Sequence, residues 1–263
     1  MYKAQMGEKP GFGGRYENNM KIDIFGIKFD DVEAERAVVH ACEIINSGNK
    51  AYVVTPNPEI IWMARRDNAL LTAVNGAELV LSDGVGVIIG ARILGTPLRG
   101  GRVPGIDFAS ALFAKMAQTG RSVFLMGAKP GVAELAGNKL MEKYPGLDIA
   151  GTADGYFTDD EPIIEKINSA HPDLLLVCLG SPKQELWMAE NLGRLRVKLC
   201  AGLGGSLDVY AGNVKRAPVF FRKLGMEWLY RLFREPRRIK RMAKLPLFIL
   251  ALVWKRLRRR TVG

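Results

Sequence analysis

The residue with the clearest chemical potential is Asp83, which follows the apolar run Leu79 to Leu81 in the sequence LVLSDGVGV. Three consecutive apolar residues fit a short buried strand, and Gly84 and Gly86 allow a tight turn into a helix. Asp83 is therefore expected at the carboxyl end of a strand, where open α/β sheets bind ligands. A carboxylate at that edge can accept a proton from a substrate hydroxyl. The alternative is that Asp83 only caps the following helix.

Three further predicted strand ends carry polar or glycine-rich sequences, and the carboxyl ends of parallel strands meet at one edge of a sheet. These sequences are Thr55 with Asn57, the segment Gly180 to Gln184, and the segment Gly202 to Asp208. Asn57 is also a good N-cap residue, and Pro58 suits the first turn of the helix that follows. The convergence of these strand ends with Asp83 favours a ligand site over a simple helix cap.

Two glycine-rich segments could hold phosphate. The segment Gly95 to Gly105 has Arg99 and Arg102 as its only charges, and a flexible loop with forked guanidinium donors suits a diphosphate. The alternative is an ordinary solvated loop. The turn from Gly127 to Gly131 follows an apolar strand and opens a helix, so its backbone amides could face a phosphate or a ribose.

Apolar strands alternate with amphipathic helices along most of the chain, which predicts an α/β fold. The short connections indicate a mostly parallel sheet with helices on both faces, similar to a Rossmann fold. We expect a first strand at Lys21 to Phe29 and then a helix capped by Asp30 or Asp31. Residues 1–19 are rich in glycine and polar residues, lack the apolar core of a signal peptide, and are expected to form a disordered leader.

Charge divides the chain into a nearly neutral body and a strongly basic tail. The 263 residues contain 38 Lys and Arg against 27 Asp and Glu, a net charge of +11. The stretch from Lys215 to Arg260 holds 16 basic and 2 acidic residues, so it carries +14 and leaves −3 for the rest. Cys42, Cys178 and Cys200 lie in apolar runs without metal-ligand spacing, which predicts buried thiols in a reducing cytoplasm.

Residues 218–263 are predicted to form a basic, amphipathic, helical appendage. Aromatic and aliphatic residues recur every three or four positions from Phe220 to Phe233, among arginines and lysines. The apolar run Leu245 to Trp254 is much shorter than the roughly 20 residues that span a bilayer. It suits the interface of an anionic membrane, and its apolar content disfavours nucleic acid as a partner. The remaining alternative is packing against protein, because such an apolar surface also suits a homo-oligomer.

Five motifs, in this order along the chain, resemble the WecG/TagA/CpsF family of bacterial glycosyltransferases. They are TPNPEII (Thr55 to Ile61), SDGVGV (Ser82 to Val87), RVPGID (Arg102 to Asp107), GSPKQE (Gly180 to Glu185) and GLGGSLDVYAG (Gly202 to Gly212). The similarity covers roughly Lys21 to Arg241. It implies an inverting enzyme, peripheral on the inner face of the cell membrane, with residues 20–217 as its α/β catalytic domain and residues 218–263 as a membrane-associating appendage.

The resemblance also implies the substrates. A UDP-sugar would donate an N-acetylmannosamine-type sugar to N-acetylglucosamine on undecaprenyl diphosphate, for a polymer such as teichoic acid, common antigen or capsule. Neither a metal nor another cofactor is implied, in agreement with the lack of a DxD-type motif. The donor could instead carry N-acetylmannosaminuronic acid or glucose. A non-catalytic protein that binds nucleotides or polyanions is the alternative from another class.

By the same resemblance, Asp83 is the general base, Thr55 and Asn57 orient the acceptor, and Arg102 and Gln184 hold the donor sugar and its diphosphate. Nucleoside contacts are implied for Tyr156 and Asp208, and contacts to a diphosphate for the appendage residues Arg231, Arg238 and Arg241. The alternatives are helix capping for Gln184, turn formation for Asp208, and attraction to anionic lipid for the arginines. Two features depart from the family pattern: Pro56, which can redirect Thr55, and the basic, apolar extension Leu245 to Arg260.

Overall fold

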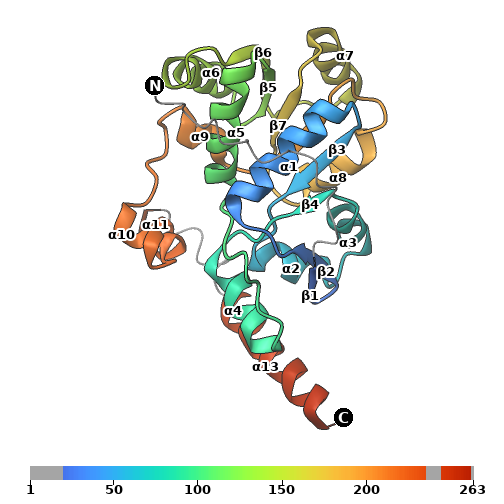
Figure 1. The fold of residues 1–263 in the computed structure, drawn as a ribbon, viewed down its shortest axis with the longest axis vertical. Helices are drawn as coiled ribbons and strands as arrows, with labels where there is room; N and C mark the ends of the chain where they lie inside the picture. The colour runs from blue at the N-terminus through green and yellow to red at the C-terminus, as the bar shows by residue number, and fades with distance from the viewer. Residues whose placement is uncertain (1–19, 235–243, 262–263) are drawn as a thin grey trace, which may run out of the picture.

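The structure is a computed structural model that describes residues 20–234 and 244–261 of the chain (Figure 1). Its centre is a six-stranded parallel sheet in the order β4-β3-β8-β7-β5-β6, and a separate antiparallel hairpin pairs β1 with β2. The strands are β1 (Lys21–Ile24), β2 (Ile27–Asp30), β3 (Ala51–Val54), β4 (Leu79–Val80), β5 (Ser122–Gly127), β6 (Asp148–Ala153), β7 (Leu174–Cys178) and β8 (Leu199–Gly202). The predicted α/β fold with a parallel sheet is confirmed.

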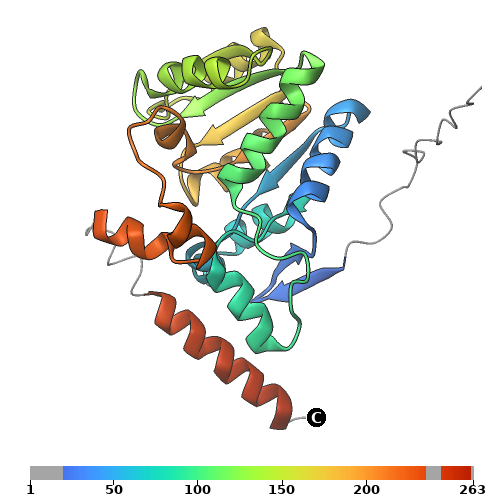
Figure 2. The ribbon, with the colours of Figure 1, turned by 60° about the vertical axis from the view of Figure 1, so that its left-hand side comes forward.

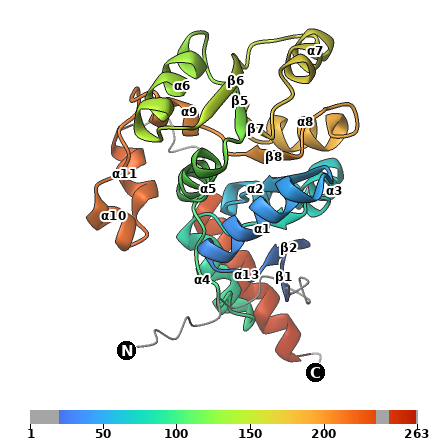
Figure 3. The ribbon, with the colours of Figure 1, turned by 45° about the horizontal axis from the view of Figure 1, so that its top comes forward.

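Helices cover both faces of the sheet, so the protein has two hydrophobic cores (Figure 3). The helices of the body are α1 (Ala34–Ser47), α2 (Pro58–Ala64), α3 (Asn68–Asn75), α4 (Val85–Leu94), α5 (Gly105–Thr119), α6 (Val132–Lys143), α7 (Asp160–Ala170), α8 (Lys183–Asn191) and α9 (Ser206–Tyr210). One core joins the sheet to α1, α5, α6 and α9, and the other joins it to α2, α3, α4, α7, α8 and the hairpin.

The central strands are apolar throughout because both of their faces are covered. In β7, Leu174 and Leu176 point into one core while Leu175 and Val177 point into the other, and all four are buried. The edge strand β6 is only partly buried. Among the cysteines, Cys178 and Cys200 are buried as predicted, but Cys42 is only partly buried, at the margin of the face that α1 packs on the core.

The first predicted strand was wrong in one respect, since Lys21 to Phe29 form two strands rather than one. Phe25 and Gly26 have positive φ angles of 54° and 92° and turn the chain into the β1–β2 hairpin. Each strand of the hairpin alternates apolar and polar residues, so the segment resembles a single strand, although the phase of the alternation reverses between Ile24 and Ile27.

The predicted capping of α1 by Asp30 or Asp31 was also wrong. The N-cap residue is Glu33, and its side chain makes no capping hydrogen bond. Asp30 instead accepts a hydrogen bond from the Val80 amide at 2.8 Å, and Asp31 accepts one from the Gly100 amide at 2.7 Å. Both aspartates therefore tie the hairpin to segments that border the carboxyl edge of the sheet.

The carboxyl-terminal region is helical, as predicted, but the first predicted helix is broken. α10 (Val219–Lys223) and α11 (Glu227–Arg234) are separated by a turn at Gly225, and α13 (Lys244–Thr261) follows. α13 lies beside α4 and also contacts α2 (Figure 2). None of the helices in these described ranges is long and apolar enough to cross a membrane.

α13 has two apolar faces. Phe248 and Leu252 are fully buried against the body, whereas Leu250 and Trp254 on the other face are 65% and 56% exposed. Packing on the protein thus accounts for only one face of the predicted membrane segment Leu245 to Trp254. The other face remains an apolar surface at the edge of the molecule.

Candidate active site

A cavity of about 230 Å³ lies between the carboxyl edge of the sheet and the carboxyl-terminal helices. Four of the residues predicted from the sequence line its body side, namely Thr55, Asn57, Asp83 and Arg102. The opposite wall contains Gly225, Glu227, Trp228, Lys244 and Leu245. Two separate parts of the chain therefore build one cavity.

Asp83 is held at this edge by the backbone of the neighbouring strand. The Leu81 amide donates to the Val54 carbonyl at 2.9 Å, and the Asp83 amide donates to the Pro56 carbonyl at 3.3 Å. The N-cap residue of α4 is Gly84, so the cap position does not belong to Asp83. Asp83 lines the cavity, and its role toward a ligand stays a prediction.

Thr55 and Asn57 also line the cavity, but each uses part of its side chain to hold the edge together. The Thr55 hydroxyl donates to the Gly202 carbonyl at 3.3 Å. The Asn57 oxygen accepts hydrogen bonds from the amides of Glu59 and Ile60 at 2.9 and 3.2 Å, which is the predicted N-cap of α2. The amide NH₂ group of Asn57 is therefore the part of that side chain that can donate to a ligand.

Arg102 lies in a loop that is fixed, not flexible as predicted. The Ser82 hydroxyl donates to the Gly101 carbonyl at 2.7 Å, and the Val103 amide donates to the Ser82 carbonyl at 2.9 Å. These bonds join the loop to the strand end that carries Asp83. Arg102 lines the cavity and donates to the Arg222 carbonyl of α10 at 3.3 Å, whereas Arg99 is exposed and does not line it.

Four other predicted residues do not line this cavity: Gln184, Tyr156, Asp208 and Gly127. Tyr156 is 68% exposed in the loop after β6, and Asp208 is partly buried in α9. They belong to segments that follow β5 to β8 along the same edge of the sheet. Asp208 stands in α9 between the cavity residues Ser206 and Val209, whereas Tyr156 follows the edge strand β6 at the other end of the sheet from β4.

The side chain of Gln184 is buried, and both its oxygen and its NH₂ group make a hydrogen bond within the protein. Its oxygen accepts a hydrogen bond from the Gly204 amide at 2.9 Å, and its NH₂ group donates to Glu185 at 2.9 Å. Glu185 also accepts from the Ser181 hydroxyl at 2.8 Å, and burial raises the pKa of its carboxyl group. In this arrangement Gln184 fixes the turn that enters α9.

Gly127 has a structural reason to be glycine. Its φ angle is 135°, and a Cβ atom there would lie 2.3 Å from the Cys178 carbonyl oxygen. The predicted phosphate-binding turn is thus also a point where the end of β5 lies close against Cys178 at the end of β7. Burial raises the pKa of the neighbouring Cys178 thiol to about 12, so that thiol stays neutral.

The appendage arginines can be placed only in part. Arg231 lies in α11, and Arg238 and Arg241 lie outside the described residues. Sequence reasoning missed the cavity residues Glu227 and Trp228, because only the periodic apolar residues and the arginines of this helix were considered, as a membrane surface and as diphosphate contacts. An acidic residue at the start of a basic helix was the available signal, since Glu227 is one of two acids between Lys215 and Arg260.

An ion pair lies directly behind the cavity wall. Both guanidinium NH₂ groups of Arg216 donate to Asp107, at 2.5 and 2.6 Å. Burial favours the neutral form of Asp107, but the hydrogen bonds and charge of Arg216, with the charges of Arg222 and Arg102, hold its pKa below the usual range. Asp107 is therefore ionised at neutral pH.

The arrangement supports proton transfer and anion binding at one place. Asp83 can accept a proton, Arg102 can offset negative charge, and the indole ring of Trp228 can pack against a sugar ring. In the part of the chain that the structure describes, no three His, Cys, Asp or Glu side chains gather in a way that could hold a metal ion.

Comparison with known proteins gives a consistent result. The sequence profile of the glycosyl transferase WecG/TagA/CpsF family matches residues 22–262. An N-acetylglucosaminyldiphosphoundecaprenol N-acetyl-beta-D-mannosaminyltransferase of Bacillus spizizenii strain W23 is 36% identical over 228 residues, which cover 86% of this chain and 88% of the relative. An enzyme of the same name from Staphylococcus aureus strain MRSA252 is 35% identical over 234 residues, which cover 88% of this chain and 92% of the relative.

Proposed function

Because the chain belongs to the WecG/TagA/CpsF family of glycosyltransferases, we propose that it transfers N-acetylmannosamine from UDP to undecaprenyl-diphosphate-linked N-acetylglucosamine. The names of the two relatives support this acceptor and this sugar. The observation that carries the proposal is the meeting of Asp83, Thr55, Asn57 and Arg102 in one cavity. The product would serve the synthesis of a cell-surface polymer such as teichoic acid.

In the proposed reaction, Asp83 removes the proton from the acceptor hydroxyl while that oxygen attacks the anomeric carbon of the donor. The bond between the anomeric carbon and the diphosphate oxygen breaks on the opposite face, and UDP leaves with the electron pair. Arg102 offsets the negative charge that develops on the leaving diphosphate. Thr55 and Asn57 orient the acceptor beside Asp83, and this attack inverts the anomeric configuration.

Other predicted residues keep their proposed roles farther along the same edge. Tyr156 and Asp208 would contact the nucleoside, and amides near Gly127 would face its ribose or phosphate. Gln184 would help to hold the donor sugar and its diphosphate, and the turn that it fixes at Gly204 lies next to it. Arg231, Arg238 and Arg241 would close over a diphosphate.

The proposed division of the chain is a catalytic domain at residues 20–217 and an appendage at residues 218–263. The contribution of Gly225, Glu227 and Trp228 to the cavity supports an appendage that completes the active site. Exposed apolar side chains on the appendage, such as Phe220, Phe233 and Leu250, support peripheral attachment to the inner face of the membrane. A lipid-linked acceptor would be reached there, whereas a second copy of the chain is the other candidate for this surface.

The reaction is tested by UDP release from UDP-N-acetylmannosamine with a short-chain lipid-diphosphate N-acetylglucosamine. Release should require both substrates and should fall sharply in Asp83→Asn. If UDP-N-acetylmannosaminuronic acid or UDP-glucose supports faster release, the proposed donor is wrong. If no UDP-sugar supports release with this acceptor, the proposed reaction is wrong.

Attachment is tested by flotation with vesicles that contain anionic lipid. The wild type should float with the vesicles. Washing membranes with alkaline carbonate should release the protein, because the proposed attachment is peripheral. Phe220→Ser with Leu250→Ser should stay in the soluble fraction. If this variant floats as the wild type does, or if the wild type sediments as a dimer without lipid, the exposed surface has another role.

A further inference from the structure

The linker between α9 and α10 supplies one of the polar contacts between the two walls of the cavity. Arg216 lies in this linker, and its side chain is 20% exposed. It donates two hydrogen bonds to Asp107 in the first turn of α5, next to the cavity residues Gly105 and Ile106. A bidentate pair of this kind fixes the orientation of the guanidinium plane as well as its distance.

The same guanidinium group faces the appendage wall. The Nε atom of Arg216 lies 3.8 Å from a carboxylate oxygen of Glu227, the first residue of α11. This Nε atom is buried and has no hydrogen-bond partner. The Glu227 side chain is itself 13% exposed and lines the cavity. Arg216 thus lies between an acid of the catalytic domain and an acid of the cavity's other wall.

Further contacts set the position of the appendage beside this bridge. Arg102 donates to the Arg222 carbonyl at 3.3 Å, which ties the cavity loop to α10. A Cβ atom at Gly225 would lie 2.9 Å from Val85, so the turn between α10 and α11 rests closely on the start of α4. These contacts hold the near end of α11, and Arg216 holds its first carboxylate.

We propose that Arg216 is a positioning residue for the transfer reaction. By pairing with Asp107 and facing Glu227, it holds α11 so that Glu227 and Trp228 remain opposite Asp83 across the cavity. The reacting groups of the catalytic domain do not depend on this bridge. Its role in catalysis rests on the proposed function, whereas its role in holding α11 does not.

The first test measures hydrogen–deuterium exchange in the full chain without substrates, which separates the bridge from the reaction. In Arg216→Gln and in Asp107→Asn, amides of residues 219–234 should exchange about tenfold faster than in the wild type, because local opening of α11 becomes easier. β5 and β7 should exchange as in the wild type. The double variant should show no more than the larger single effect, because both changes break the same bridge.

The matched control is Arg194→Gln, which removes an arginine that pairs with Glu161 at an exposed site on the body. It should leave exchange at residues 219–234 unchanged. Arg216→Lys should show an intermediate effect, because lysine keeps the charge but cannot make the bidentate contact. Unchanged exchange at residues 219–234 in both Arg216→Gln and Asp107→Asn would overturn the proposal.

The second test separates positioning from chemistry. Arg216→Gln should raise KM about tenfold while kcat changes by less than about threefold, because Asp83 and Arg102 remain in place. Arg216→Lys should recover part of the loss in KM. If the wild type transfers the sugar but Arg216→Gln has unchanged kinetics, the positioning role is wrong. If the wild type transfers no sugar, the proposed function fails, and the exchange experiment still decides whether the bridge holds α11.

Discussion

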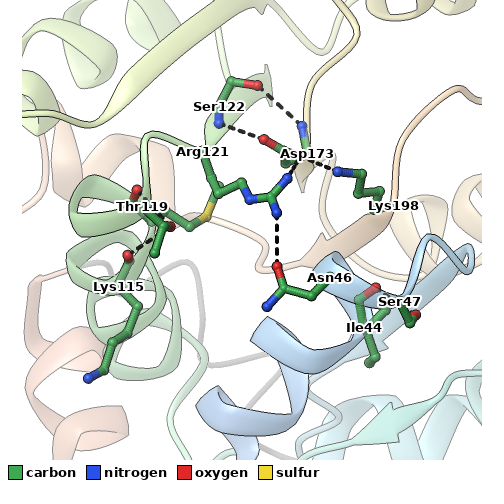
Figure 4. A network of polar contacts seen from close by, with 10 residues as sticks. Ile44, Asn46, Ser47, Lys115, Thr119, Arg121, Ser122, Asp173 and Lys198 are labelled. Carbon is green, nitrogen blue, oxygen red and sulfur yellow. Dashed lines mark hydrogen bonds and ion pairs between the residues drawn. The ribbon is translucent and has the colours of Figure 1, made fainter.

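Aspartates at the two ends of the central sheet have opposite surroundings. At the amino end, Asp173 accepts hydrogen bonds from Arg121 at 3.0 Å, Lys198 at 2.7 Å and the Ser122 amide at 3.0 Å (Figure 4). Arg121 extends the network to Asn46 at 2.9 Å. Burial favours the neutral form of Asp173, but these donors together hold its pKa below the usual range.

At the carboxyl end, Asp83 instead faces a cavity that a second part of the chain completes. Its neighbours Thr55 and Asn57 use only part of their hydrogen-bonding capacity inside the protein. Asp173 thus stabilises the fold through matched donors, whereas Asp83 lines a cavity that a substrate could enter. Substitutions at the two ends should therefore separate activity from stability.

The largest expected effect is on the rate, in Asp83→Asn. Loss of a general base lowers kcat by about 10²- to 10⁴-fold, because asparagine cannot accept the acceptor's proton. The thermal midpoint should stay within about 2 °C of the wild type, since the change is isosteric and lies at a cavity. UDP release and thermal unfolding measure the two effects. A kcat within threefold of the wild type would remove Asp83 as the base.

The opposite result is expected for Asp173→Asn. Its partners Arg121 and Lys198 lose their counter-charge, but all of them are partly solvated, so the free energy of unfolding should fall by about 1–2 kcal/mol. Activity per folded molecule should be retained, because the change lies at the other end of the sheet. Urea unfolding measures the change in the free energy of unfolding, and UDP release at low temperature measures the activity per folded molecule. Reduced kcat in fully folded Asp173→Asn would break the comparison.

The next effect is the loss of stability in acid. Asp173 and Asp107 have lowered pKa values in the folded protein, so their stabilising contributions are present above about pH 4, the unfolded value. These contributions are lost as the pH falls through the folded pKa values. Below about pH 4, the free energy of unfolding should therefore fall less steeply with decreasing pH in Asp173→Asn than in the wild type. Equal slopes in urea titrations at pH 2.5–4.5 would contradict this prediction.

The smallest effect is expected for Glu185→Gln. Burial raises the pKa of Glu185, so its contribution to stability is greatest below the unfolded value of about 4.3 and is lost as the pH rises through the folded pKa. The neutral amide of glutamine should remove this loss. At pH 7 the free energy of unfolding of the variant should therefore equal that of the wild type or exceed it by up to about 1 kcal/mol. Greater stability of the wild type at pH 7 would show that the carboxylate is needed.

Local patterns in the sequence predicted much of the fold and four residues on the body side of the cavity. The apolar run before Asp83, the cap at Asn57 and the glycine-rich turn at Gly127 depend on neighbours within a few residues, so the sequence reveals them directly. The β1–β2 hairpin was missed because each of its strands alternates apolar and polar residues, and the reversal of that alternation across Phe25 and Gly26 was not interpreted as a turn. Asp30 and Asp31 were assigned to a helix cap because their true partners, Val80 and Gly100, are distant in the chain.

The sequence by itself thus determined the parallel α/β fold, the placing of Asp83, Thr55 and Asn57 at strand ends, and the division into a neutral body and a basic tail. Only the tertiary structure decided which residues face one another across the cavity. Arg216 reaches Asp107 over 109 positions, and Arg102 reaches Arg222 over 120. Such pairs arise because the α9–α10 linker and α10 pack against the body near the sheet edge, and no periodicity of 2 or 3.6 residues encodes contacts at that separation.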